Sequence, residues 1–163
     1  FEMDLRVYSN ILNTVNVAGR LNLGEIFNWD EDYDQYESVL FEKFYLGGSN
    51  TLRAYKPLKF EQDTISTEVG SDYTLILPFG NTAKLLTNWE IRFPLSEKFG
   101  LVVFYDGGLL SQDLSIVTLD NIFWNRGIGL TYNSPFGPLR IDYGESMNDK
   151  NLNQLHFGLG YSF

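Results

Sequence analysis

Apolar and polar side chains alternate along most of this chain, and a period of two residues is typical of β-strands with one apolar face. Residues 83–93 show the pattern clearly, because mostly apolar side chains at every second position alternate with Lys84, Asn88, Glu90 and Arg92. The same pattern predicts about seven strands of membrane-spanning length. They lie near residues 2–7, 15–23, 83–93, 100–108, 126–133, 139–143 and 155–163.

The connections between these strands differ in length in a regular way, since short turns alternate with long loops. Outer-membrane β-barrels have this asymmetry, with short turns on one side of the membrane and longer loops on the other. A soluble β-sandwich also alternates apolar and polar residues, but it has no reason to sort its connections by length. The pattern therefore predicts an all-β fold, the strands of an antiparallel transmembrane β-barrel. The turns lie near residues 10–14, 94–99 and 134–137, and the loops near residues 24–82, 109–125 and 144–153.

Composition and charge narrow the classes of protein to consider. The 163 residues are 44% hydrophobic and 16% aromatic, yet no apolar run approaches the roughly 18 residues that a transmembrane helix needs. A net charge of −9 argues against a surface that binds nucleic acid. The absence of cysteine excludes disulfides and thiolate chemistry. The chain opens at Phe1 without the features of a signal peptide, so we expect it to be part of a longer mature protein.

Much of the negative charge lies in one acidic run, residues 30–37. An EF-hand needs a glycine pivot and a terminal bidentate glutamate at a set spacing, and this run does not provide them. We interpret the run as a solvated loop, with cation binding as the alternative.

The loop near residues 25–81 is far longer than most connections between strands, and such loops are often functional. It contains a glycine pair that predicts a tight turn, followed by a single arginine between apolar and aromatic neighbours. These candidate residues are Gly47, Gly48, Leu52, Arg53, Ala54 and Tyr55.

Two carboxylates are predicted to meet this arginine. Strand alternation places Glu90 on the inward face of one strand, and an inward Asp106 leaves the apolar residues of the next strand for lipid. Because carboxylates can hold a guanidinium through paired, charge-assisted hydrogen bonds, we expect Arg53, Glu90 and Asp106 to form a clasp that tethers the loop. The alternatives are a solvent-exposed arginine, an ordinary polar barrel wall, and a carboxylate pair for acid–base catalysis.

The last residues of the sequence form a second candidate motif. They resemble the β-signal by which the assembly machinery recognises bacterial outer-membrane proteins, and an exposed strand edge of this kind can be paired by β-augmentation. Glycine in a strand interior weakens it. We therefore predict a last strand over residues 155–163 that forms a weak seam, with an ordinary last strand as the alternative. The residues concerned are His156, Gly158, Gly160, Tyr161 and Phe163.

Four segments of the chain resemble the C-terminal barrel strands of the Omp85 superfamily, which includes BamA, TamA and two-partner secretion transporters. The segments extend over most of the chain and occur in the same order as in that family. They are residues 45–55, 89–94, 103–108 and 127–144. The resemblance implies a larger barrel of about 16 strands, with upstream strands and periplasmic POTRA domains outside residues 1–163. In this family an arginine at the tip of the sixth external loop, in a V/I-R-G-F/Y pattern, contacts acidic residues on the inner wall. Here the corresponding sequence is Leu52-Arg53-Ala54-Tyr55, with alanine in place of glycine.

The resemblance also implies a function, that of a BamA-like factor that inserts other barrel proteins into the outer membrane of a Gram-negative-type bacterium. The implied partners are the lipid bilayer, unfolded outer-membrane client proteins and periplasmic accessory proteins or lipoproteins. A TamA-like factor or a two-partner secretion transporter is the alternative within the family, and a passive porin or the membrane anchor of a fused enzyme is the alternative from another class. We expect no enzymatic activity, metal or cofactor, because no motif places a nucleophile beside His156.

Overall fold

The computed structural model describes residues 1–11, 14–27, 43–60, 63–69 and 73–163. These residues are almost entirely in strands and loops, with two short 3₁₀ turns, η1 (Leu114–Ile116) and η2 (Leu119–Asn121). No helix in the described part of the chain is long and apolar enough to cross a membrane. The strands are β1 (Glu2–Ile11), β2 (Val15–Glu25), β3 (Asp63–Val69), β4 (Tyr73–Phe79), β5 (Ala83–Pro94), β6 (Phe99–Ser111), β7 (Phe123–Ser134), β8 (Gly137–Ser146) and β9 (Asn153–Leu159).

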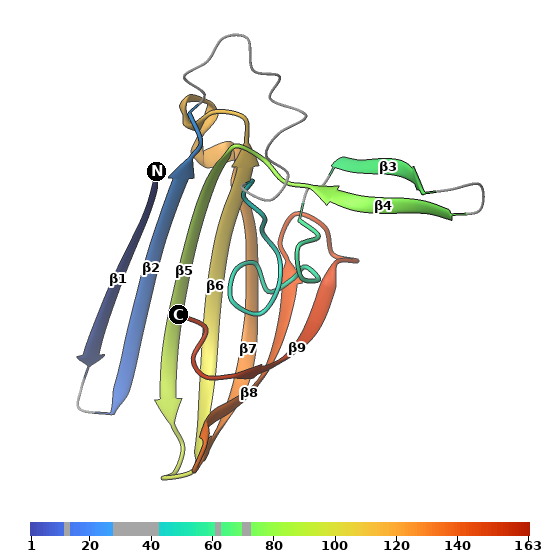
Figure 1. The fold of residues 1–163 in the computed structure, drawn as a ribbon. Helices are drawn as coiled ribbons and strands as arrows, with labels where there is room; N and C mark the ends of the chain where they lie inside the picture. Colours follow the sequence, from blue (N-terminus) through green and yellow to red (C-terminus); the bar gives the residue numbers. More distant parts are fainter. Residues whose placement is uncertain (12–13, 28–42, 61–62, 70–72) are drawn as a thin grey trace.

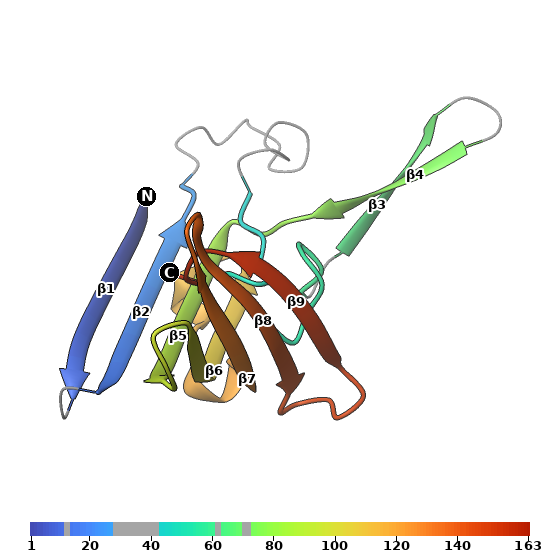
Figure 2. The ribbon, with the colours of Figure 1, turned by 90° about the horizontal axis from the view of Figure 1, so that it is seen from below.

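Seven of the described strands form one antiparallel sheet in the order β1-β2-β5-β6-β7-β8-β9. This sheet confirms the predicted all-β, antiparallel fold class. The sheet is curved, with β1 at one edge and β9 at the other (Figures 1 and 2). The teal segment, residues 43–60, lies on its hollow side (Figure 1).

The two faces of the sheet differ in polarity as a membrane barrel requires. The outer face exposes large apolar side chains such as Trp89, Ile128 and Phe157. A soluble sandwich would instead bury its apolar face and expose its polar one, so the inverted pattern favours a sheet whose outside meets lipid. The buried polar side chains of the inner face include Asn22, Asn88, Glu90, Asp106, Asn125, Arg140, Asp142 and His156.

Residues 43–60 pack against the hollow side through a small apolar cluster. Leu46, Leu52 and Phe60 of this segment are buried against Leu86 of β5 and Leu110 of β6. Full burial of a side chain of this size stabilises a structure by about 1.5–3 kcal/mol. The cluster therefore fixes one end of the segment inside the curve of the sheet.

The structure adds a hairpin within the predicted long loop. β3 and β4 pair with each other from Asp63 opposite Phe79 to Val69 opposite Tyr73, and the hairpin projects away from the main sheet (Figures 1 and 2). The sequence predicted one long loop over residues 25–81 and gave no strands within it. The acidic run at residues 30–37 and part of the turn near residues 10–14 lie outside the described residues.

The predicted last strand was wrong at its end. We expected it to continue to Phe163, but β9 ends at Leu159. The next residue, Gly160, has φ of +89°, a conformation that glycine adopts without steric cost and that turns the chain. Residues 160–163, which we call the inward tail, leave the sheet edge and run back across the hollow side (Figure 1).

Candidate functional site: an arginine loop docked on the inner wall

Residues 46–60 form a compact turn stabilised by their own backbone. The N–H of Gly48 donates to the carbonyls of Leu52, at 3.3 Å, and Tyr55, at 3.1 Å. Gly47 and Gly48 have φ of +102° and +110°, a region in which other residues are strained. The glycine pair therefore permits the turn that presents the arginine to the sheet.

Alanine in the place of the motif's glycine is compatible with this turn. Of the non-glycine residues that the structure describes, only Leu58 has a positive φ, so Ala54 needs no conformation reserved for glycine. Ala54 is buried. The motif's glycine is thus not required here for the backbone.

Arg53 is held by two carboxylates from neighbouring strands. Its Nε and Nη2 donate to the two oxygens of Asp106 on β6, at 2.9 and 2.7 Å, and its Nη1 donates to Glu90 on β5, at 2.5 Å. Its backbone N–H also donates to Asp106, at 3.3 Å. The structure thus brings together the three residues grouped from the sequence, which we call the Arg53 clasp, with the paired geometry that a guanidinium favours.

The Arg53 clasp is removed from solvent. The side chains of Arg53 and Asp106 are 0% exposed and that of Glu90 is 2% exposed. The guanidinium carbon lies 3.5 Å from the centre of the Phe104 ring, a favourable cation–π position. Burial alone would lower the pKa of Arg53, but Asp106, Glu90 and a third carboxylate, that of Asp142, raise it above its ordinary value. Arg53 is therefore a buried cation that depends on its carboxylates.

A second group of polar side chains, from β8, also holds the loop, and these residues were not among the site residues predicted from the sequence. Arg140 Nη2 donates to the Ser49 carbonyl at 2.9 Å and to Asn50 Oδ1 at 3.1 Å. Arg140 Nε lies 2.7 Å from Asp142 Oδ2, which in turn lies 3.9 Å from Nη1 of Arg53. Alternation in the sequence puts Arg140 and Asp142 on one face of their strand, and that is the available signal.

Two further inner-wall residues shape the surface on which the loop rests. Gly144 of β8 lies against the loop backbone, and a Cβ at this position would collide with the carbonyl group of Arg53. Asn88 of β5 donates to the Thr51 carbonyl at 2.7 Å and to Asp106 at 2.8 Å. The wall therefore accommodates the loop by shape as well as by charge.

β9 and the inward tail reach the Arg53 clasp from the other side. His156 Nε2 lies 3.1 Å from the Arg53 carbonyl oxygen, and because a carbonyl only accepts, Nε2 carries the hydrogen. The Ser162 hydroxyl donates to Oε1 of Glu90. Arg92 Nε donates to the other oxygen of Glu90 at 2.8 Å. Glu90 is thus shared by the loop, the tail and Arg92.

The other residues of the predicted terminal motif lie close to these groups. The rings of Tyr161 and Phe163 have their centres 4.5 and 5.7 Å from the guanidinium carbon of Arg92. Gly158 is opposite Arg140 in the pairing of β8 with β9, and a Cβ there would approach Arg140 Nη2 to 3.1 Å. Gly160 makes the turn into the tail, and its N–H donates to the Pro138 carbonyl at 2.8 Å. Each of these residues therefore lies on the inner side or leads to it.

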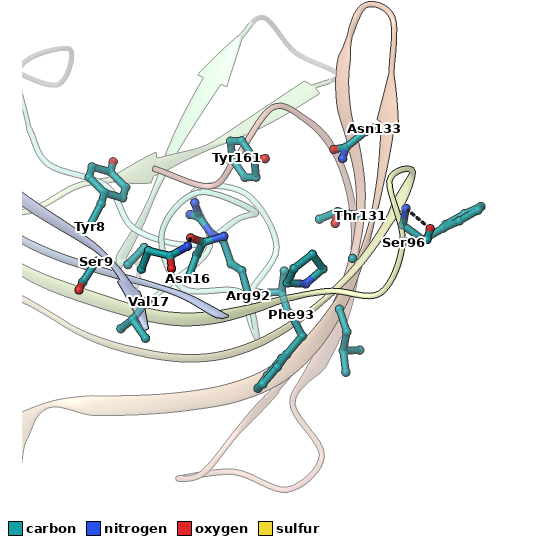
Figure 3. Close-up of a pocket in the computed structure, with 17 residues that line it drawn as sticks. Tyr8, Ser9, Asn16, Val17, Arg92, Phe93, Ser96, Thr131, Asn133 and Tyr161 are labelled. Atoms are coloured by element: carbon teal, nitrogen blue, oxygen red, sulfur yellow. Dashed lines mark hydrogen bonds between the residues drawn. The ribbon is translucent and has the colours of Figure 1, made fainter. Parts of the chain in front are cut away.

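A pocket of about 420 Å³ borders this arrangement near the short turns of the sheet. Tyr8 and Asn16 come from β1 and β2, Arg92 from β5, Thr131 from β7, and Tyr161 from the inward tail (Figure 3). Because Arg92 also binds Glu90, the pocket adjoins the Arg53 clasp. The inward tail can therefore be approached from the turn side of the sheet.

The contacts of the site join the loop to the inner wall of the sheet. Glu90 and Asp106 are both paired with Arg53, so both carboxylates are occupied in holding the loop. In the described part of the chain, no group of three or more His, Asp and Glu side chains could hold a metal ion. The site therefore fixes one segment of the chain against another.

Comparisons with known proteins indicate the family and the fold of the chain. A family model described as the Omp85 superfamily domain matches residues 1–163. The chain is 28% identical over 127 residues to Outer envelope protein 80, chloroplastic, of Arabidopsis thaliana, a match that covers 73% of this chain and 15% of that protein. The crystal structure of BamA from Haemophilus ducreyi lacking POTRA domains 1–3 has a TM-score of 0.64 at 15% identity, covering 96% of this chain and 32% of that one. The chain thus spans a small part of each of these longer proteins.

Proposed function

Because the chain belongs to the Omp85 superfamily, we propose that it is part of an outer-membrane β-barrel that inserts other barrel proteins into the membrane without enzymatic chemistry. Its direct partners are then the lipid bilayer and unfolded client barrels, with accessory proteins on the turn side. Further strands complete the barrel, since β1 and β9 are the two edges of the described sheet.

The docked loop is the observation that carries this proposal. A passive pore needs an open interior, whereas here residues 43–60 lie inside the curve of the sheet (Figure 1) and are anchored there by the buried Arg53 clasp. A buried arginine between two carboxylates is costly to assemble, and it gains nothing for simple diffusion through a pore. The anchored loop therefore favours a protein that works on polypeptides over a porin or a passive membrane anchor.

The edge strand β9 supplies a place at which a client strand could pair. It is seven residues long and lies at the end of the sheet, and its outward side chains Leu155, Phe157 and Leu159 are exposed. A free strand edge provides backbone donors and acceptors for an incoming strand, while alternate side chains face lipid. A short edge strand that ends at a glycine turn is weakly held and suits repeated pairing and release.

Replacement of the clasp arginine tests the proposal. In the full-length protein reconstituted in lipid vesicles, Arg53→Ala is expected to reduce insertion of a small client barrel at least about tenfold, because two buried carboxylates lose their cation. Insertion is measured by the shift in gel mobility that distinguishes a folded barrel from its unfolded form. Arg126→Ala is the matched control, since Arg126 pairs with Glu145 on the outer face with 64% of its side chain exposed.

Unchanged insertion by Arg53→Ala, with the loop still resistant to protease, would contradict the proposal. The same vesicles separate insertion from secretion, the alternative function within the family. A client that becomes folded in the bilayer indicates a BamA-like or TamA-like insertase, and a client protected inside the vesicle in unfolded form indicates a polypeptide transporter.

A further inference from the structure

The inward tail and the arginine loop bind the same carboxylate oxygen. Oε1 of Glu90 accepts from Arg53 Nη1 and from the Ser162 hydroxyl. Its other oxygen accepts from Arg92. Because the Glu90 side chain is almost fully buried, water cannot easily replace a donor that leaves. Removal of the tail therefore changes the bonding of the atom that holds Arg53.

β9 contacts the same loop at its backbone. The hydrogen bond from His156 Nε2 to the Arg53 carbonyl joins the edge strand to the residue at the centre of the Arg53 clasp. Both residues are buried, and a buried carbonyl that loses its donor is costly. Outward movement of β9 therefore acts directly on the docked loop.

Arg92 provides a second route between the tail and Glu90. Its guanidinium binds Glu90 through Nε and lies near the rings of Tyr161 and Phe163. Withdrawal of the tail removes these two cation–π contacts and exposes more of the Arg92 side chain, which is 15% exposed with the tail in place. The tail thus affects Glu90 through a hydroxyl and through a neighbouring cation.

We propose that His156 and Ser162 are positioning residues that couple the edge strand to the Arg53 clasp, so that displacement of β9 and the inward tail loosens the docked loop. The coupling gives the proposed insertase a means to release the loop when a client pairs with β9, and in that respect it rests on the proposed function. Coupling between two sites is reciprocal, so release of the loop also loosens the tail.

The absence of cysteine from the chain permits a single-thiol test of the loop. Thr51→Cys is nearly isosteric, and the Thr51 hydroxyl oxygen is buried without a hydrogen-bond partner in the described structure. The rate at which a maleimide labels this cysteine is measured in the purified full-length protein, otherwise free of cysteine, in detergent and without client. Ser162→Ala and His156→Leu are each expected to raise the rate about fivefold, the effect of losing one net hydrogen bond.

Conservative variants distinguish coupling from general disruption. Ser162→Thr keeps the hydroxyl and His156→Gln keeps an N–H donor, so both are expected to label at nearly the parent rate. Ser134→Ala is the control for loss of a serine hydroxyl, because that hydroxyl donates to the Gly137 carbonyl in a distant turn.

Two results would overturn the proposal. One is an unchanged labelling rate of Thr51→Cys in both Ser162→Ala and His156→Leu. The other is an equal increase in the conservative variants, which would mean that any change at these positions disturbs packing. The measurement contains no client, so a protein that shows the expected rates but fails to insert clients retains the coupling and refutes the proposed function alone.

Discussion

Two arginine–carboxylate pairs on opposite faces of this sheet have nearly the same geometry and very different surroundings. Arg53 lies 2.5 Å from Glu90 and 2.7 Å from Asp106 with none of its side chain exposed. Arg126 lies 2.6 Å from Glu145, with 64% and 39% of the two side chains exposed. Judged by the N···O distance alone, the two arginines would be expected to contribute equally to stability.

The surroundings separate them energetically. Arg126 and Glu145 lie near the loop ends of β7 and β8, where water rather than lipid surrounds the strands. Such an exposed pair is worth about 0–1 kcal/mol, because water solvates either partner when the other is lost. A buried charge that loses its partner has no such compensation, and breaking a buried pair costs about 3–5 kcal/mol. The buried clasp also joins a loop to two strands, whereas the exposed pair joins strands that are already paired through their backbones. The comparison teaches that the burial of an ion pair and the segments it connects decide its importance.

Charge reversal at the buried Arg53 clasp should destabilise the protein more than any other change proposed here. Glu90→Lys places a cation beside Arg53 and Arg92, and we expect it to destabilise the docked loop by roughly 3–5 kcal/mol. Lys84→Glu is the opposite charge reversal on the same strand and face. It breaks the ion pair of Lys84 with Glu2, whose side chain is 49% exposed, and should destabilise the protein by less than about 2 kcal/mol. The temperature at which the folded barrel loses its characteristic gel mobility measures both effects.

If Glu90→Lys and Lys84→Glu lowered that temperature equally, burial would not distinguish the Glu90 site from the Lys84 site. Glu90→Gln serves as the milder control, because it keeps the shape of the side chain and an acceptor oxygen while removing the charge. We expect its effect to fall between those of the two reversals.

A change of shape without charge tests whether the fit of the loop matters in addition to the ion pairs. Gly144→Ala adds a methyl group where the Arg53 carbonyl lies, and because backbone cannot easily move aside, we expect a loss of about 1–3 kcal/mol. Gly158→Ala is the matched control, since its methyl group would meet the flexible end of Arg140. Thermal stability that is lowered more by Gly158→Ala than by Gly144→Ala would contradict this account.

Strand alternation was sufficient to predict most of the main sheet and the inward direction of Glu90 and Asp106. It could not show that Arg140 reaches Ser49 and Asn50, because the curvature of the sheet, rather than the period of a single strand, brings β8 to the loop. The role of Gly144 was not predicted for the same reason. A Cβ on Gly144 would meet the backbone of Arg53, which lies 91 positions away in the sequence.

The two differences in the fold have separate causes. β3 and β4 carry β-branched and aromatic residues, but they lie within a long connection between two predicted strands, so the hairpin was not predicted. At the other end, apolar alternation continues through Tyr161 and Phe163, so periodicity gave no sign of the turn at Gly160. The reason for that turn lies in contacts with Glu90 and Arg92, which are distant in sequence.

The smallest expected effect lies at the exposed pair and sets the lower end of the comparison. Arg126→Ala removes the hydrogen bond from Nε to Glu145, at 2.7 Å, and the ion pair beside it, yet we expect a loss below about 1 kcal/mol and an unchanged labelling rate at Thr51→Cys. The residue opposite, Glu145, remains hydrated because it is partly exposed and lies one residue from the loop end of β8. A larger loss of stability would mean that side chains on the outer face, where β7 pairs with β8, also help to hold the terminal strands. The ion pairs on the two faces would then differ only in how much they stabilise the protein.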